Sequence, residues 1–119
     1  MKRVYLKMQE RDTWDDEFTK SIIGYYKIII PRRNRQTGII TEDYQIIRKV
    51  REVLYSDIES IKSDEDEVEV SCYKGCGDFV ETLEDLYKLK KEIEERVEKK
   101  MEEAKIFDYT LIIELNTLY

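Results

Sequence analysis

Three stretches of the chain alternate apolar and polar residues, which is the pattern of strands that bury one face. They are Val4–Met8, Val68–Cys72 and Phe107–Leu115. A fourth stretch, Ser21–Ile30 (SIIGYYKIII), is apolar on both sides apart from Lys27, and it is rich in β-branched and aromatic residues. That composition predicts a central strand.

A turn rich in arginine follows the central strand. Pro31 cannot donate a backbone hydrogen bond to a sheet, so it is expected to end the strand. The turn itself holds Arg32, Arg33 and Arg35. Residues 39–40, both isoleucine, could then form a short return strand.

Two amphipathic helices are predicted from apolar residues that recur at spacings of three and four. The first runs from about Thr41, a hydroxyl N-cap, to about Lys62. Its apolar stripe consists of Ile47, Val50, Leu54, Ile58 and Ile61. The second starts at a capping box that begins at Asp78 and runs to about Lys105. Its apolar positions are Val80, Leu83, Leu86, Ile93, Val97, Met101 and Ala104.

Polar segments connect these elements. Glu10–Phe18 is expected to be a loop around the only tryptophan, and Ser63–Glu67 is an acidic connector. Gly75 and Gly77 predict a turn before the second helix.

The elements follow the order β-β-(β)-α-β-α-β and predict an α+β fold in a single domain over residues 1–119. The expected architecture is one four- or five-stranded antiparallel or mixed sheet with two amphipathic helices packed on one face. Two helices cannot cover both faces, so the other face must be wet or bind something. We expect a symmetric homodimer that buries part of it, with Tyr25, Ile23 and Ile29, or with the alternate set.

Composition indicates a thermostable protein. Charged residues make up 40% of the chain, glutamate and lysine dominate them, and there are only three glutamines and two asparagines. This bias is typical of hyperthermophiles. No apolar run is long enough to span a bilayer, and the amino terminus lacks the apolar core of a signal peptide, so a cytoplasmic location is expected.

The net charge of -6 is divided unevenly along the chain. Residues 1–63 hold 13 basic and 10 acidic residues, whereas residues 64–119 hold 8 basic and 17 acidic residues. This asymmetry predicts two oppositely charged faces or a head-to-tail contact between copies.

The chain has no histidine, which excludes Ser-His-Asp and Cys-His catalysis and imidazole metal sites. Gly75 and Gly77 do not fit a phosphate-binding loop. The acids of 64–69 could hold magnesium only if they converged from separate elements, and their nearly consecutive order predicts a solvated loop instead. We therefore expect a protein that is not an enzyme and uses no cofactor.

Cys72 and Cys76 form a CxxxC pattern with three interpretations. They could be unpaired buried thiols, or they could form a small disulfide across the glycine turn. They could also supply half of a zinc site, completed by carboxylates or by the same pair from a second subunit.

The arginine turn also leaves three interpretations open: a solvated turn, a contact with another protein, or a nucleic-acid site. In the last case the arginines could follow phosphates while Tyr25 and Tyr26 stack on bases. The net charge of -6 opposes the approach of a polyanion.

Four segments, SIIGYYKIII, SDEDEVEV, DLYKLKKEIEERVEKKMEEAK and FDYTLIIELNTLY, together resemble the small proteins of viruses that infect hyperthermophilic archaea. In character the chain is similar to the acidic anti-CRISPR proteins of rod-shaped archaeal viruses, which inhibit type I-D effectors. The resemblance is one of texture across the whole chain, so it transfers no functional residue. It implies a stoichiometric inhibitor, often dimeric, that binds a large host nuclease complex such as a CRISPR effector and acts in the host cytoplasm.

The sequence thus predicts a protein-binding module that competes for a basic surface of a nucleic-acid-handling complex. The predicted contact is an acidic face made by Glu65, Asp66, Glu67 and Glu69. The arginine turn, with Arg32, Arg33 and Arg35, would contact a separate acidic patch or the dimer mate. The alternative is a nucleic-acid-binding protein that uses the same arginine turn.

Overall fold

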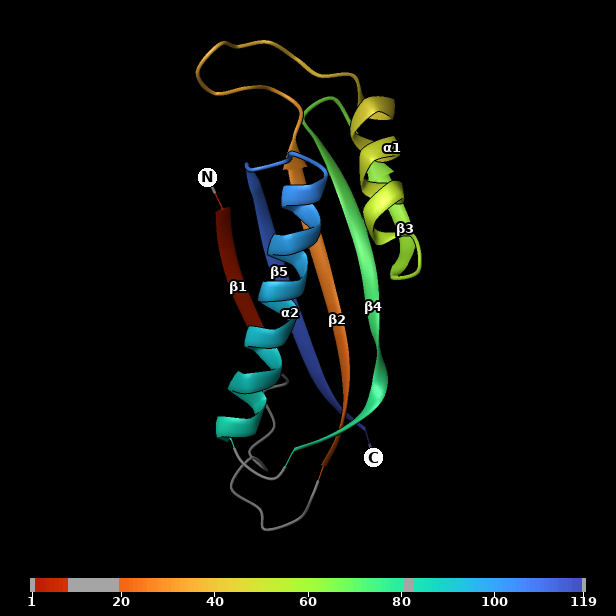
Figure 1. Ribbon diagram of the computed structural model, residues 1–119, viewed down its shortest axis with the longest axis vertical. Helices are drawn as coiled ribbons and strands as arrows, with labels where there is room; N and C mark the ends of the chain where they lie inside the picture. Colours follow the sequence, from red (N-terminus) through yellow and green to blue (C-terminus); the bar gives the residue numbers. More distant parts are fainter. Residues whose placement is uncertain (1, 9–19, 81–82, 119) are drawn as a thin grey trace.

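The fold is a five-stranded mixed sheet with two helices on one face, as the sequence predicts (Figure 1). The computed structural model describes residues 2–8, 20–80 and 83–118. The strands are β1 (Lys2–Met8), β2 (Lys20–Pro31), β3 (Ile58–Ser63), β4 (Glu67–Val80) and β5 (Tyr109–Leu118). The helices are α1 (Asp43–Leu54) and α2 (Leu83–Glu103). Neither helix in the described part of the chain is long and apolar enough to cross a membrane.

The strand order is β1-β5-β2-β4-β3, with β1 parallel to β5 and the other neighbours antiparallel. From β2 to β5 the chain therefore has the β-α-β-β-α-β connectivity of ferredoxin-like folds, and β1 is added at the edge beside β5. Both helices lie on the same face of the sheet, as expected when two crossover connections have the same hand (Figure 1). This architecture hosts many functions, so it fixes none by itself.

The central strand β2 shows how the two faces differ. Tyr26, Ile28 and Ile30 are buried against the helices, whereas Tyr25 and Lys27 are only partly buried on the other face. From α2, the side chains that meet the sheet are fully buried: Ile93, Val97 and Met101. The core thus lies entirely between the helices and one face of the sheet.

The first predicted helix is wrong beyond Leu54. The chain turns there, with the Asp57 amide donating to the Leu54 carbonyl, and Ile58 and Ile61 belong to β3. In a regular strand these two isoleucines would point to opposite faces. A register shift between Ile58 and Ser60 inserts one extra residue, which leaves both isoleucines packed against the core at a spacing that imitates a helix.

The predicted glycine turn is also wrong, because β4 continues through it. Ile22 pairs with Asp78 and Ile23 with Cys76, so Gly77 is an extra residue in the ladder, and a second shift follows between Gly24 and Tyr25. These irregularities bend the strand without ending it. The predicted capping box at Asp78 is therefore wrong, and α2 begins at Leu83.

Two smaller predictions have different outcomes. The return strand at 39–40 is reduced to one isolated bridge between Arg33 and Ile40. The predicted loop Glu10–Phe18 lies outside the described residues.

The carboxyl end of α2 has an unusual cap. Lys105 has a φ of 56°, in the left-handed region that glycine normally occupies after a helix. The amide of Ile106 donates to the carbonyl of Met101 at 2.9 Å, and the amide of Lys105 donates to the carbonyl of Glu102 at 3.0 Å. This is the Schellman arrangement, with Ile106 packed against the core.

We expect Lys105→Gly to raise the free energy of unfolding by about 1 kcal/mol, because glycine adopts the left-handed conformation without the steric cost of a side chain. Denaturant unfolding would measure it. The matched control is Lys99→Gly at an exposed position inside α2, which should lower the free energy of unfolding by about 1 kcal/mol. A similar loss at both positions would contradict the strain assigned to Lys105.

Candidate functional site

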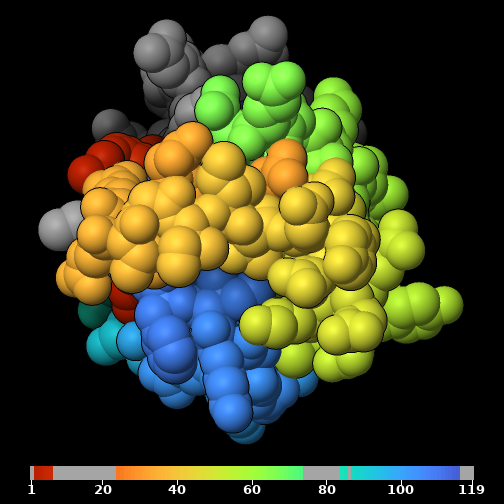
Figure 2. Space-filling view, turned by 90° about the horizontal axis from the view of Figure 1, so that it is seen from above, coloured from red at the N-terminus to blue at the C-terminus, as the bar shows by residue number. Residues whose placement is uncertain are grey.

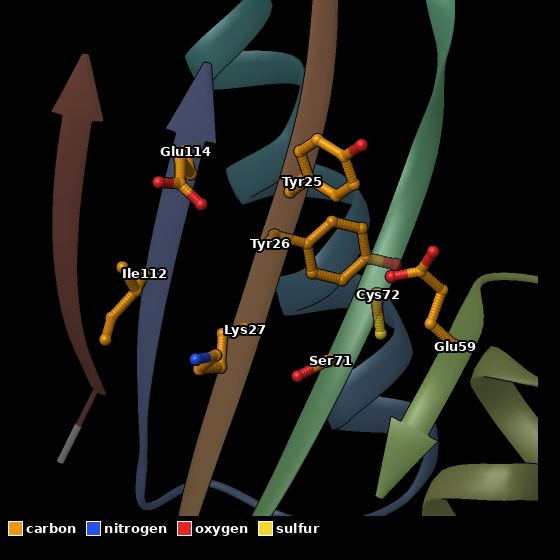
Figure 3. Close-up of a pocket in the computed structure, with 8 residues that line it drawn as sticks. All are labelled: Tyr25, Tyr26, Lys27, Glu59, Ser71, Cys72, Ile112 and Glu114. Atoms are coloured by element: carbon orange, nitrogen blue, oxygen red, sulfur yellow. The ribbon is translucent and has the colours of Figure 1, made fainter. Parts of the chain in front are cut away.

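No described helix covers the face of the sheet opposite α1 and α2 (Figure 1), which we call the open face. Figure 3 shows several side chains of the strands that form it. Its central side chains come from β2, β4 and β5, and most are partly exposed. They are Tyr25, Lys27, Ile29, Glu69, Ser71, Tyr73, Thr110, Ile112 and Glu114. The flanking strand β1 adds Tyr5, whose exposed fraction is 53%.

Aromatic rings and a charge pair occupy the centre of the open face. Tyr25 and Tyr73 face each other across β2 and β4, with ring centroids 5.2 Å apart and an interplanar angle of 42°. The Lys27 ammonium lies 2.9 Å from the Glu69 carboxylate. The hollow between these strands measures about 200 Å³, below the roughly 300–1,000 Å³ of typical small-molecule sites. A broad macromolecular surface fits this face better than a small ligand does.

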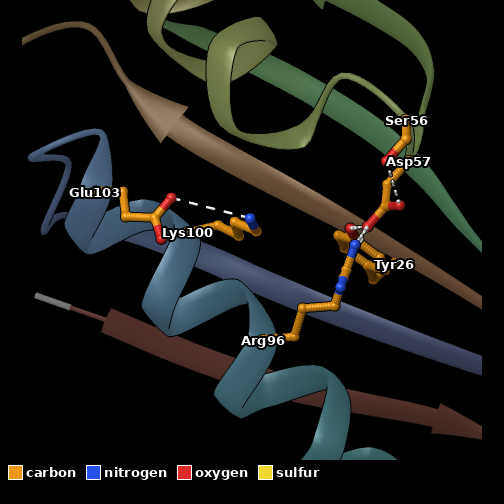
Figure 4. Close-up of polar contacts among 6 residues, drawn as sticks. All are labelled: Tyr26, Ser56, Asp57, Arg96, Lys100 and Glu103. Carbon is orange, nitrogen blue, oxygen red and sulfur yellow. Dashed lines mark hydrogen bonds and ion pairs between the residues drawn. The ribbon is translucent and has the colours of Figure 1, made fainter.

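A polar network that is buried at Tyr26 and exposed at Arg96 lies on the opposite, helix-covered side of the sheet (Figure 4). The Tyr26 hydroxyl donates to Asp57 Oδ2 at 2.7 Å. Arg96 donates to the same oxygen through Nε at 3.0 Å, and its Nη2 forms an ion pair with that oxygen at 2.9 Å. The network therefore joins β2, the connection between α1 and β3, and α2. The hydrogen bond from Arg96 to Asp57 raises the pKa of the Arg96 guanidinium above its usual value.

Two potential nucleophiles near this network are held in their protonated forms. Burial raises the pKa of Tyr26, and the neighbouring Cys72 and Asp57 add to the effect. Burial also raises the pKa of the Cys72 thiol to about 12, although its hydrogen bond with Tyr26 opposes the rise. Neither side chain is anionic near neutral pH, so neither is activated for nucleophilic chemistry. The suggestion that Tyr26 stacks on bases is wrong, since only 2% of it is exposed.

The acidic connector forms a tight turn between β3 and β4. The Asp64 carboxylate accepts the backbone amides of Asp66 at 2.7 Å and Glu67 at 2.9 Å. These hydrogen bonds lower the pKa of Asp64, and the one from the Glu67 amide contributes most. Glu65 and Asp66 are exposed at the tip, while Glu67 and Glu69 lead onto the open face.

Arg32 braces this acidic turn from the neighbouring loop. Its guanidinium donates to the Asp64 carbonyl at 2.6 Å and to the Thr41 carbonyl at 3.1 Å, and its own amide donates to the Asp66 carbonyl at 2.9 Å. Only 15% of the Arg32 side chain is exposed. Arg32 is thus committed to the fold, which the sequence did not indicate.

The other two arginines of the turn are exposed. Arg33 donates to the Gly38 carbonyl at 3.0 Å, and Arg35 lies 4.0 Å from the Asp108 carboxylate. Figure 2 shows the loop that carries them in orange and yellow, with the β3–β4 turn in green on one side and the corner between α2 and β5 in blue on the other. The acidic and basic segments, which the sequence left as separate contacts, therefore meet at one end of the molecule.

The cysteines lie in β4. Cys72 is a free, buried thiol on the core side. The free thiol of Cys72 agrees with the interpretation of unpaired thiols and not with a disulfide to Cys76, whose side chain lies outside the described residues. Within the described residues, no group of three or more histidine, cysteine, aspartate or glutamate side chains could hold a metal ion.

Comparison with known proteins adds no relative. No known protein family, no curated protein and no solved structure matches this chain.

Sequence reasoning missed three features of these surfaces. It did not pair Tyr73 with Tyr25, it did not join Asp57 to Arg96, and it gave no special role to Lys105. The first two depend on strand register and helix packing between residues far apart in the chain, which no local pattern encodes. The third had one signal: the second helix ends without a glycine.

Protonated Cys72 should make stability fall at alkaline pH. Its pKa is about 12 in the folded protein and about 9 in the unfolded chain, so its contribution is present below pH 9 and is lost as pH rises toward 12. Between pH 8 and pH 10.5 we expect the wild type to lose about 2 kcal/mol more of its free energy of unfolding than Cys72→Ala. Equal losses in the two proteins would show that the thiol titrates normally.

Proposed function

We propose that this protein is a non-enzymatic, dimeric protein-binding module that occupies a basic surface of a nucleic-acid-handling complex. The observation that carries the proposal is the construction of the acidic turn. Asp64 closes it by two hydrogen bonds, and Arg32 braces it from behind, while Glu65 and Asp66 stay exposed. A rigid turn presents these carboxylates with little entropy left to lose on binding.

Charge around the turn supports a basic partner. Glu65 and Asp66 are exposed at the tip, and the guanidinium of Arg32 donates to the Asp64 and Thr41 carbonyls and lies 3.8 Å from the Glu42 carboxylate. Exposed carboxylates of this kind speed association with a positively charged groove and compete there with the natural polyanion. Glu69 contributes less than the sequence predicts, because Lys27 already pairs with it.

The open face supports the dimeric part of the proposal. Tyr25 and Ile29, two of the three residues expected at a dimer interface, lie on it, and the side chain of Ile23 lies outside the described residues. Tyrosine is enriched at the centre of protein interfaces, and a polar rim surrounds such centres. A second copy placed on this face leaves the acidic turn exposed at the end of each protomer.

The resemblance to acidic anti-CRISPR proteins supports the class of partner. Those proteins bind host effector complexes that handle nucleic acid and therefore carry basic channels. A small, acidic, thermostable chain with a rigid carboxylate turn suits the same mode of action in the cytoplasm of a host cell.

The test compares two variants with the same change in net charge. Glu65→Lys/Asp66→Lys reverses the turn, and Glu92→Lys/Glu95→Lys reverses two exposed acids on α2. Each biotinylated protein is incubated with a nuclease-treated lysate of a thermophilic archaeon, and captured proteins are quantified by mass spectrometry. The turn variant should lose its host partners at low salt, with a smaller difference at high salt, because charge attraction is screened over about 10 Å at 0.1 M.

The control on α2 should capture the same proteins as the wild type. Equal capture by all three proteins would remove the acidic turn from the binding surface. Equal loss of captured proteins in both variants would show that overall charge, and not the acidic turn itself, determines capture.

A further inference from the structure

A basic groove lies beside the arginine turn, on the helix side of the same end of the molecule. It measures about 580 Å³ and is lined by the loop after β2, the first turns of α1 and the corner between α2 and β5. Five of its fifteen lining residues are basic, whereas only Asp108 is acidic. In a protein with 27 acidic and 21 basic residues, this is a local reversal of charge.

The cations of the groove are largely unneutralised. Lys49 and Lys105 are exposed and make no ion pair or side-chain hydrogen bond in the part of the chain that the structure describes. Among the described residues, the Arg33 side chain donates only to the Gly38 carbonyl of its own turn, and Arg35 lies 4.0 Å from the Asp108 carboxylate. Four positive side chains therefore stand around one hollow with a single carboxylate among them.

The backbone at Lys105 is a second and independent indication. Its φ of 56° lies where glycine is favoured and where a side chain costs about 1–2 kcal/mol. A strained residue that persists at a surface often serves binding or catalysis. Here the strain places a lysine at the groove beside Phe107, whose exposed fraction is 63%.

The neighbouring surface of α1 continues the pattern. Arg48 and Arg51 line a shallow hollow together with Tyr44 and Tyr55, whose exposed fractions are 61% and 81%. Glu52 is the one acidic residue that lines this hollow, and Lys49 of the same helix lines the groove. Exposed aromatic rings among cations are the combination that binds single strands, because bases stack on the rings while the cations follow the phosphates.

We propose that this groove, defined by Arg33, Arg35, Lys49, Lys105 and Phe107, binds single-stranded nucleic acid. The cations contact consecutive phosphates, and Phe107 stacks on a base. The site is separate from the acidic turn, from which the loop after β2 divides it (Figure 2). Binding of nucleic acid in the groove and binding of a basic partner by the acidic turn can therefore be tested separately.

The experiment is fluorescence anisotropy with a short labelled single-stranded oligonucleotide, as DNA and as RNA, over a range of salt concentrations. Each phosphate contact contributes about -0.7 to the slope of log affinity against log salt, so four contacts predict a slope of about -3. Lys49→Gln and Lys105→Gly should each weaken binding and reduce that slope by about 0.7. Phe107→Ala should weaken binding at least about fivefold with the slope unchanged.

The controls separate binding from stability and from overall charge. Lys105→Gly is expected to stabilise the fold, so weaker binding by this variant cannot come from unfolding, and Lys105→Arg should restore affinity. Lys91→Gln removes an exposed charge from the middle of α2 and should change nothing.

Three results would overturn the inference. They are the absence of binding at low salt, equal weakening by Lys91→Gln and Lys49→Gln, and a preference for duplex over single strand. If polyglutamate bound with the same affinity as the oligonucleotide, and if Phe107→Ala did not change that affinity, the groove would be assigned to an acidic protein instead.

Discussion

The structure depends on one constraint: the helices bury a single face of the sheet, so the strand side chains that form the core must all lie on that face. In β2 this separates Tyr26, Ile28 and Ile30 from Tyr25 and Lys27, which alternate with them. A slip of one residue would exchange the two sets and expose the core. The bulge in β3 satisfies the same constraint, since its extra residue leaves both Ile58 and Ile61 packed against the core.

The charged end of the molecule follows from the connections that this sheet requires. The loop from β2 to α1 must cross the end of the sheet, where it meets the β3–β4 turn and the α2–β5 corner. Arg32 fixes the first contact, and in doing so it separates an exposed acidic turn from a basic groove. A chain with a net charge of -6 can thus present two surfaces of opposite sign a short distance apart.

The sequence predicted the fold class because alternation and helical spacing report directly on one-sided burial. It failed where two periodicities coincide: Ile58 and Ile61 are three apart in a bulged strand and therefore looked helical. Gly75 and Gly77 looked like a turn because glycine serves bulges as well as turns. At the candidate sites, charge along the sequence identified the acidic segment and the arginine turn. Only the fold shows that Arg32 is structural, and that Lys49 and Lys105 line the same groove as the other two arginines of the turn.

The central claim is that the two faces of the sheet have different roles, one as core and one as the interface of a homodimer. Hydroxyl-radical footprinting over a dilution series tests it most directly, because tyrosines lie on both sides of the molecule. The account predicts that Tyr25 and Tyr73 are protected at high protein concentration and become reactive on dilution, while Tyr55 and Tyr87, which are 81% and 52% exposed, react equally throughout. Reactivity of Tyr25 and Tyr73 that does not depend on concentration, or protection that falls on Tyr87 instead, would contradict it.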